Sequence, residues 1–265
     1  VKFLRAAAGE GAAGPPSWAP DGGMIVSAAP RPGWRPTVEC EALDALVKIG
    51  ARAVPLLVDA LQTRDPLIRV CAAETLGQIG DSRATIPLIE ALQDEDWNLR
   101  HTAASALPGL GDKRAVVALI AALDDGVPIV RHCAARALGA MQDVHAVEPL
   151  LSALKSTDDA LRWEAAEALG RIGHNSATER LLWALLDREP LVRRCAAEAL
   201  GNIADPQAVV GLSRALQDEN SDVRHSAASA LARLRHPDAL AALAVALMGV
   251  YLPFGEVLER MGTAE

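Results

Sequence analysis

Apolar and polar positions along this chain follow the period of an α-helix, and the helical pattern itself recurs at a fixed interval. The stretch "LRHTAASALPGLGD" at residues 99–112 is followed 31 residues later by "VRHCAARALGAMQD" at residues 130–143. Within each copy the apolar residues stand three or four positions apart, which places them on one side of a helix. A fixed interval between near-copies is typical of a protein built from stacked repeats.

An arginine marks the same place in every copy. It recurs at intervals of 31 residues, as Arg69, Arg100, Arg131, Arg162, Arg193 and Arg224. The residue before it is Ile, Leu or Val and the residue seven positions after it is Leu, so both belong to one apolar stripe. A second helical run, such as "TIPLIEAL" or "ATERLLWAL", precedes each arginine. Each repeat is therefore predicted to be a helix A, a short turn and a helix B that carries the arginine.

A helix pair of this size cannot bury its apolar face alone, so the pairs must stack on one another. We predict an all-α fold, an α-solenoid or superhelix of antiparallel helix pairs. A half repeat at 38–52 is expected to precede six full repeats at 53–238, and a shortened capping repeat at 239–265 to follow them. Residues 1–37 are rich in Pro, Gly and Ala and are expected to be an irregular arm, either extended or folded over the end of the stack.

The turn before helix B carries an acid four residues ahead of the arginine, where a carboxylate can cap the helix. Three such acids are Asp65, Asp96 and Asp158. We expect each arginine to reach the capping acid of its own or a neighbouring repeat, so that these residues form a structural ladder that fixes the stacking. Arg131 has Val127 at the cap position. Asp124 or Asp125 is expected to replace the missing acid.

Glycine is common eight residues after the arginine. Four repeats have it, and the other two have Pro108 and Ala232. Because glycine and proline weaken the interior of a helix, helix B is expected to loosen at this position.

Composition and charge limit the classes of partner that the chain is expected to bind. The chain has 265 residues, a formal net charge of −8 and a pI of about 5.3, which argues against a nucleic-acid partner. No apolar run is long enough to span a bilayer, and no signal-peptide pattern is visible, so no membrane partner is expected. The four cysteines form no C-x-x-C pair, and a cytoplasmic location is predicted. The chain starts at Val1 rather than at a methionine, as a processed or trimmed fragment would.

Helix pairs with "[LV]R…AA.ALG.IGD" at a 31-residue interval resemble the short HEAT-like repeats of the phycobilisome-lyase (E-Z) type, over about residues 38–262. The resemblance implies a superhelix in which the second helix of each pair lines the concave surface, the usual binding face. Proteins with such repeats include bilin lyase subunits, deoxyhypusine hydroxylase and scaffold domains. The resemblance therefore implies a fold more specifically than a function.

Two positions of helix B vary between repeats, one and five residues after the arginine. A surface strip that mixes Trp, His, Arg and Glu is typical of recognition. We predict a non-catalytic scaffold that binds a protein or peptide partner on the concave helix-B face, and Trp163 is its strongest anchor unless it packs against a neighbouring helix. The predicted binding residues are His101, His132, Trp163, Arg194, His225, Arg136, Glu167 and Glu198.

The resemblance to deoxyhypusine hydroxylases raises the question of a metal site, because His-Glu dipeptides in those repeats hold two irons. The aligned dipeptides here are His101-Thr102, His132-Cys133, Trp163-Glu164 and His225-Ser226. No His-Glu pair is present, and a di-iron site needs carboxylates. A zinc or copper site from His101, His132 and Cys133 lacks a visible fourth ligand. We expect no metal, no cofactor and no catalytic residue, which favours an adaptor over an enzyme.

Two alternatives stay open. The resemblance allows a bilin lyase or bilin-binding protein, in which Arg162 and Arg194 beside Trp163 would suit the two propionates of a tetrapyrrole and a cysteine would carry it as a thioether. A helical-repeat DNA-binding protein would need a basic concave face, which the net charge disfavours.

Overall fold

The structure is a computed structural model that describes residues 38–247, with side chains from 43 to 246. These residues form α-helices and short 3₁₀-helices and contain no strand. None of the described helices is both long and apolar enough to cross a membrane. The predicted arm at 1–37 and the end of the predicted capping repeat lie outside the described residues.

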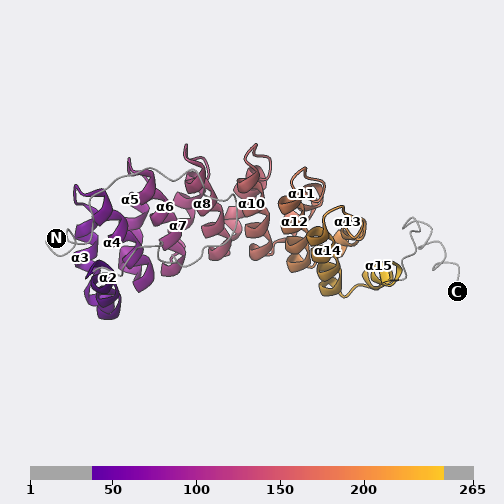
Figure 1. Ribbon diagram of the computed structural model, residues 1–265, viewed down its shortest axis with the longest axis horizontal. Coiled ribbons are helices and arrows are strands. Elements are labelled where there is room, and N and C mark those ends of the chain that lie inside the picture. Colours follow the sequence, from indigo (N-terminus) through magenta and orange to yellow (C-terminus); the bar gives the residue numbers. More distant parts are fainter. Residues whose placement is uncertain (1–37, 248–265) are drawn as a thin grey trace. The chain divides into compact units, whose positions relative to one another are not determined.

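The helices alternate between two classes along the chain (Figure 1). Those in the helix-A position are short: α3 (Val54–Leu61), α5 (Thr85–Ala91), α7 (Ala115–Ala122), α9 (Val147–Ala153), α11 (Thr178–Ala184) and α13 (Val209–Ala215). Those in the helix-B position are longer: α4 (Pro66–Ile79), α6 (Trp97–Ala106), α8 (Pro128–Met141), α10 (Asp159–Ile172), α12 (Pro190–Ile203) and α14 (Ser221–Leu234). The described part begins with α2 (Val38–Ile49) and ends with α15 (Pro237–Leu247). This alternation confirms the predicted all-α solenoid.

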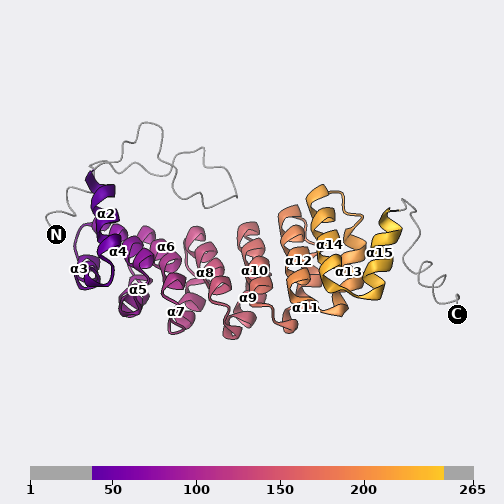
Figure 2. The ribbon, with the colours of Figure 1, turned by 90° about the horizontal axis from the view of Figure 1, so that it is seen from below.

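The chain divides into two compact units, the first ending at Ala134 and the second beginning at Ala135, within α8. In the first unit α4 packs against both α2 and α6. In the second, α12 packs against both α10 and α14. Figure 2 shows α10, α12 and α14 side by side, with α9 and α11 displaced to one side of that row.

The core of each unit consists of the apolar stripe that the sequence repeats. The leucine seven positions after each arginine is at most 1% exposed in all six repeats. The Ile, Leu or Val before each arginine is buried as well, and alanine fills most of the other buried positions of the B helices. Leucine and alanine favour helices and leave room for close helix contacts. The low aromatic content of the chain follows from this mode of packing.

The glycines eight residues after the arginine do not loosen helix B, so that prediction is wrong for them. Helices α10 and α12 continue through Gly170 and Gly201 to Ile172 and Ile203. A Cβ atom on Gly170 would lie 2.6 Å from the Cα atom of Ala199 on the next helix. Glycine is required here because two backbones approach closely. Helix B is interrupted only at Pro108, where α6 gives way to a 3₁₀-helix at Leu107–Leu110.

Candidate functional site

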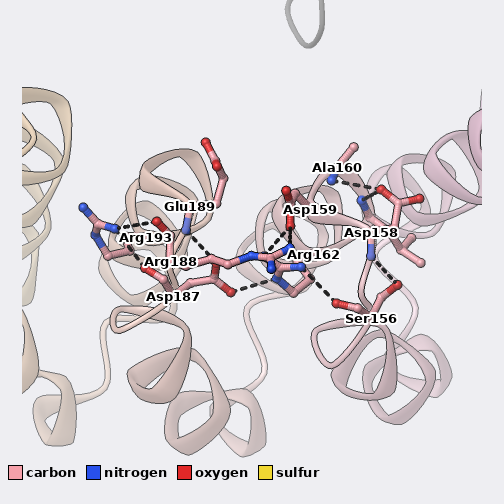
Figure 3. Close-up of polar contacts among 10 residues, drawn as sticks. Ser156, Asp158, Asp159, Ala160, Arg162, Asp187, Arg188, Glu189 and Arg193 are labelled. Atoms are coloured by element: carbon pink, nitrogen blue, oxygen red, sulfur yellow. Dashed lines mark hydrogen bonds and ion pairs between the residues drawn. The ribbon is translucent and has the colours of Figure 1, made fainter.

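Four of the recurring arginines bind an aspartate in the turn of the following repeat and a backbone carbonyl in their own turn. In the second unit Arg162 donates from Nε and Nη2 to the two carboxylate oxygens of Asp187, at 2.8 Å each, and from Nη1 to the carbonyl of Ser156 at 3.0 Å (Figure 3). Arg193 repeats this pattern with Asp218, at 2.7 and 2.9 Å. In the first unit Arg100 binds Asp125 at 2.7 and 3.0 Å. We call these arginine–aspartate pairs, together with Arg69–Asp94, the ladder.

The carboxylate partner of the ladder arginines differs from the predicted one. Asp65 and Asp96 accept hydrogen bonds from the amides of Leu67 and Asn98, as helix caps do. Asp158 likewise accepts from the first amides of α10. The arginine instead binds an aspartate two residues before the cap of the next repeat. The sequence prediction chose the capping acid instead of this aspartate, because the two positions lie in the same turn.

Arg131 and Arg224 share with the other four arginines a bond to the backbone of their own turn. Arg131 donates from Nη1 to the backbone carbonyl of Asp125 at 2.9 Å, whereas the Asp125 carboxylate binds Arg100. The positive charge of Arg131 also contributes to lowering the pKa of Asp125, so this carboxylate interacts with both arginines. Arg224 donates to the carbonyls of Asp218 and Glu219. These backbone bonds keep the guanidinium at the same edge of the helix.

The carboxylates of Asp125 and Asp218 stay ionised at neutral pH. The Arg100 guanidinium, hydrogen-bonded to Asp125, holds the pKa of that carboxyl below its ordinary value. The bond from Arg193 does the same to the pKa of Asp218. Both members of each pair are largely buried, with side chains 15% and 11% exposed for Arg100 and Asp125. The ladder pairs are therefore mainly structural, although Asp94, Arg100 and Asp125 also line a pocket of about 320 Å³ in the first unit.

A second set of polar side chains lies on the B helices of the second unit. Residues spaced by four share one face of a helix, so three positions on each of α10, α12 and α14 make a surface that we call the grid. The grid consists of Trp163, Glu167 and Arg171 on α10, Arg194, Glu198 and Asn202 on α12, and His225, Ser229 and Arg233 on α14. All nine are half-buried or exposed.

Side chains of the grid contact one another within and between helices. Arg171 pairs with Glu167 at 2.5 Å along α10. Arg233 donates from Nη1 to Oδ1 of Asn202 at 2.6 Å, joining α14 to α12. By contrast, Arg194 lies 3.9 Å from the nearest oxygen of Glu198. Its Nε atom is shielded from water and has no hydrogen-bond partner.

A pocket of about 300 Å³ opens in the grid between α12 and α14. Its lining residues are Glu198, Asn202, His225, Ser226, Ser229 and Arg233. The hydroxyl of Ser226 donates to Oε1 of Glu198 at 2.9 Å and so fixes one oxygen of that carboxylate. The pocket is polar on both walls, and its geometry suits a small charged group.

Beside the grid lies a buried carboxylate, Glu164 of α10. It is 2% exposed, its Oε1 accepts from Nη1 of Arg136 at 3.3 Å, and its Oε2 is buried without a hydrogen bond. Burial raises the pKa of Glu164 to about 7, although the positive charge of Arg136 opposes that rise. This carboxyl can therefore change its charge near neutral pH.

The structure divides the eight predicted binding residues between the two units. His101 on α6 and His132 on α8 belong to the first unit and are half-buried. The other six belong to the second unit, where five lie in the grid and Arg136 pairs with Glu164. The sequence prediction missed a third position on each helix, occupied by Arg171, Asn202 and Arg233. A further step of four residues along the same face would have found them.

Among residues 38–247, no three His, Cys, Asp or Glu side chains converge as a metal site would require. Cys133 and Cys195 are buried and Cys71 is half-buried. Burial raises the pKa of Cys195 to about 12, so this thiol is protonated at neutral pH.

Comparison with solved structures places the chain among helical-repeat proteins. An engineered protein matches 69% of this chain with 96% of its own length, at 26% identity and a TM-score of 0.52. A designed armadillo repeat protein in complex with the peptide (KR)4 matches 69% of this chain with 99% of its own, at 21% identity and a TM-score of 0.56. The CpcE–CpcF complex of phycocyanin lyase from Nostoc sp. PCC7120 matches 91% of this chain with 100% of its own, at 21% identity and a TM-score of 0.47.

Comparison with curated protein sequences gives no significant match. Comparison with family profiles gives a match to HEAT repeats over residues 31–96, 85–160, 128–189, 147–213 and 178–248. These overlapping segments cover most of the chain and include every helix that bears the ladder and the grid. The chain therefore belongs to the family of HEAT-repeat proteins.

Proposed function

We propose that this protein is a non-catalytic adaptor that binds a protein or peptide partner along the helix-B face of its second unit. The observation that carries the proposal is the grid, where residues differ from helix to helix on a scaffold whose core repeats almost unchanged. The core and the ladder explain why buried positions repeat. No such packing requirement applies to the grid, whose side chains reach solvent and surround a polar pocket.

The chemistry of the grid suits recognition. Trp163 is only half-buried, and tryptophan and arginine are the residues that most often dominate a protein interface. Arg194 stands at the corresponding position of the neighbouring helix α12. A designed repeat protein of similar fold is in complex with a peptide, which supports this use of the fold.

The bilin-binding alternative has weaker support. It requires Arg162 to meet a propionate beside Trp163, but the guanidinium of Arg162 is bound to Asp187 and its residue is 6% exposed. It also requires a reactive thiol, whereas Cys195 is buried and protonated. The likeness to the phycocyanin lyase complex, at a TM-score of 0.47, adds no argument.

A pull-down from the native lysate tests the adaptor proposal. The bait is the full chain, compared with a Trp163→Ala/Arg194→Ala double variant. The matched control is Trp183→Ala/Arg180→Ala, which removes the same two residue types from exposed positions on the A helix α11. A circular-dichroism melt verifies that both variants fold.

We expect the wild type and the α11 variant to retain the same partner and the grid variant to lose it. Equal retention by all three proteins would exclude the grid as the binding surface. Retention by the grid variant and loss by the α11 variant would move the site to the helix-A face.

A further inference from the structure

We infer that the grid recognises an acidic segment of its partner, and that a carboxylate of that segment enters the pocket between α12 and α14. The inference rests on the proposed function and specifies the partner's chemistry. Four observations support it: the local charge, the unsatisfied guanidinium of Arg194, the excess of donors in the pocket and the aromatic side chain beside them.

The grid has the opposite charge balance to the chain as a whole. Its nine positions contain three arginines and two glutamates, together with His225, whereas the chain carries a net charge of −8. Glu167 is neutralised by Arg171, whereas Glu198 accepts from the hydroxyl of Ser226 and keeps its negative charge. The nine positions therefore carry a formal net charge of +1 with His225 neutral. A negatively charged partner would approach it in preference to the acidic remainder of the surface.

Arg194 is the grid arginine whose charge is least satisfied within the protein. Arg171 and Arg233 each have an oxygen partner within 2.6 Å. The nearest carboxylate oxygen to Arg194 is 3.9 Å away, beyond hydrogen-bonding distance, and its Nε is buried without a partner. Leaving this one N–H without a partner costs free energy in the unbound protein, while the side chain is still 40% exposed to a ligand. A ligand carboxylate would offset that cost with short, charge-assisted hydrogen bonds.

Donors outnumber acceptors in the pocket. The amide oxygen of Asn202 accepts a hydrogen bond from Arg233, so the NH2 group of Asn202 is the part that can donate to a ligand. Arg233 keeps further N–H groups, Ser229 has a hydroxyl, and His225 has a ring N–H. The main opposing acceptor is Glu198, one of whose oxygens already accepts from Ser226. A group that only accepts hydrogen bonds, such as a carboxylate, fits this inventory better than an ammonium or a guanidinium.

Trp163 adds an apolar contact next to the positive charge. It occupies on α10 the position that Arg194 occupies on α12, and it is half-buried. An indole in this setting packs against aliphatic or aromatic side chains. The ligand that matches the whole surface is thus a peptide segment in which acidic residues alternate with apolar ones.

The test is a fluorescence-anisotropy titration of the full chain with three labelled peptides of equal length. They share the same apolar residues and differ only in whether Glu, Gln or Lys alternates with them. We expect the Glu peptide to bind at least about tenfold more tightly than the other two and to weaken as salt screens the charges.

Three variants localise the binding. Arg194→Gln and Arg233→Gln should each weaken binding of the Glu peptide by about tenfold, the effect of one lost charge-assisted hydrogen bond. The control is Arg180→Gln, which removes one positive charge from an exposed position of α11 outside the grid. This variant should leave the affinity unchanged. Thermal melts establish that all three remain folded.

Two results would overturn the inference. The first is equal or tighter binding of the Gln or Lys peptide, or no binding of the Glu peptide. The second is an equal loss of affinity in Arg180→Gln and Arg194→Gln, which would reduce the effect to net charge. In either case, loss of the native partner by the grid double variant would still support the adaptor proposal, because that pull-down makes no assumption about the partner's charge.

Discussion

Arg193 and Arg194 are neighbours in sequence and opposites in role. Arg193 has a side chain that is 9% exposed and binds Asp218 with the geometry that Arg162 adopts with Asp187. Arg194 has a side chain that is 40% exposed and no carboxylate within hydrogen-bonding distance. One step along a helix turns a residue by about 100°, from the packed edge of the repeat to its open face. The packed position repeats because its neighbour in the next turn repeats, and the open position varies because no such neighbour constrains it.

The largest expected effect comes from breaking the ladder. Asp218→Ala removes the buried, two-oxygen partner of Arg193, leaves it only a 3.3 Å contact with the exposed Glu219, and removes a bond to the amide of Asn220. We expect the free energy of unfolding to fall by about 3 kcal/mol, as for other buried pairs that lose one partner. Chemical denaturation monitored by circular dichroism measures it. Asp222→Ala removes the same charge from an exposed position of α14 and should cost below about 0.5 kcal/mol. Similar losses in both variants would contradict a structural ladder.

The buried carboxylate of Glu164 should make stability depend on pH. Its pKa is raised from 4.5 to about 7 by burial, so the folded state holds a proton that the unfolded state releases. The contribution of Glu164 to stability is therefore fully present below pH 4.5, where both states are protonated, and is lost as pH rises from 4.5 through 7. The charged groups that face it are Arg136, Glu167 and Arg171.

A Glu164→Gln variant isolates this dependence. The unfolding free energy of this variant, taken relative to that of the wild type, should rise by up to roughly 3 kcal/mol as the pH increases from mildly acidic to mildly alkaline. Denaturant titrations of both proteins across that range give the difference directly. A difference that does not change with pH would show that Glu164 does not titrate in the folded protein as proposed.

The close contact of the B helices should tolerate little added volume. A Cβ on Gly201 would lie 2.7 Å from the Cα atom of Ala230, and backbone atoms cannot move aside cheaply. Gly201→Val should therefore destabilise the protein by about 2 kcal/mol through overpacking. Gly126→Val is the matched control, because no atom lies within 4 Å of its Cβ position. Equal melting temperatures for the two variants would argue against close packing at Gly201.

The smallest effect on stability is expected in the grid. Arg171→Gln removes an exposed pair within α10, and such pairs contribute below about 0.5 kcal/mol. A thermal melt should place this variant within a few degrees of the wild type. A loss as large as that of the ladder variant would mean that the grid is part of the scaffold.

The sequence predicted the repeat and its core because buried contacts recur with the period of the chain. The 31-residue interval, the apolar stripe and the helix pairs all depend on neighbours that are themselves repeated. The same logic failed for the partner of Arg162, since Asp187 and the cap residue Glu189 share one turn of the next repeat and spacing alone cannot separate them. It also failed at Gly170, whose role depends on a backbone 29 residues away. The grid was predicted in part. Trp163 and Arg194 are residue types that are common in protein interfaces, so the sequence drew attention to them, whereas Asn202 is not such a type.

The most direct test of this account measures stability and partner binding on the same two variants, Asp218→Ala and Arg194→Gln. The account predicts that Asp218→Ala lowers the free energy of unfolding but, at a temperature where it is still folded, binds the native partner with wild-type affinity. Arg194→Gln should keep its stability and lose most of that affinity. If stability and affinity instead fall together in both variants, the ladder and the grid do not have separate roles and the central claim is wrong.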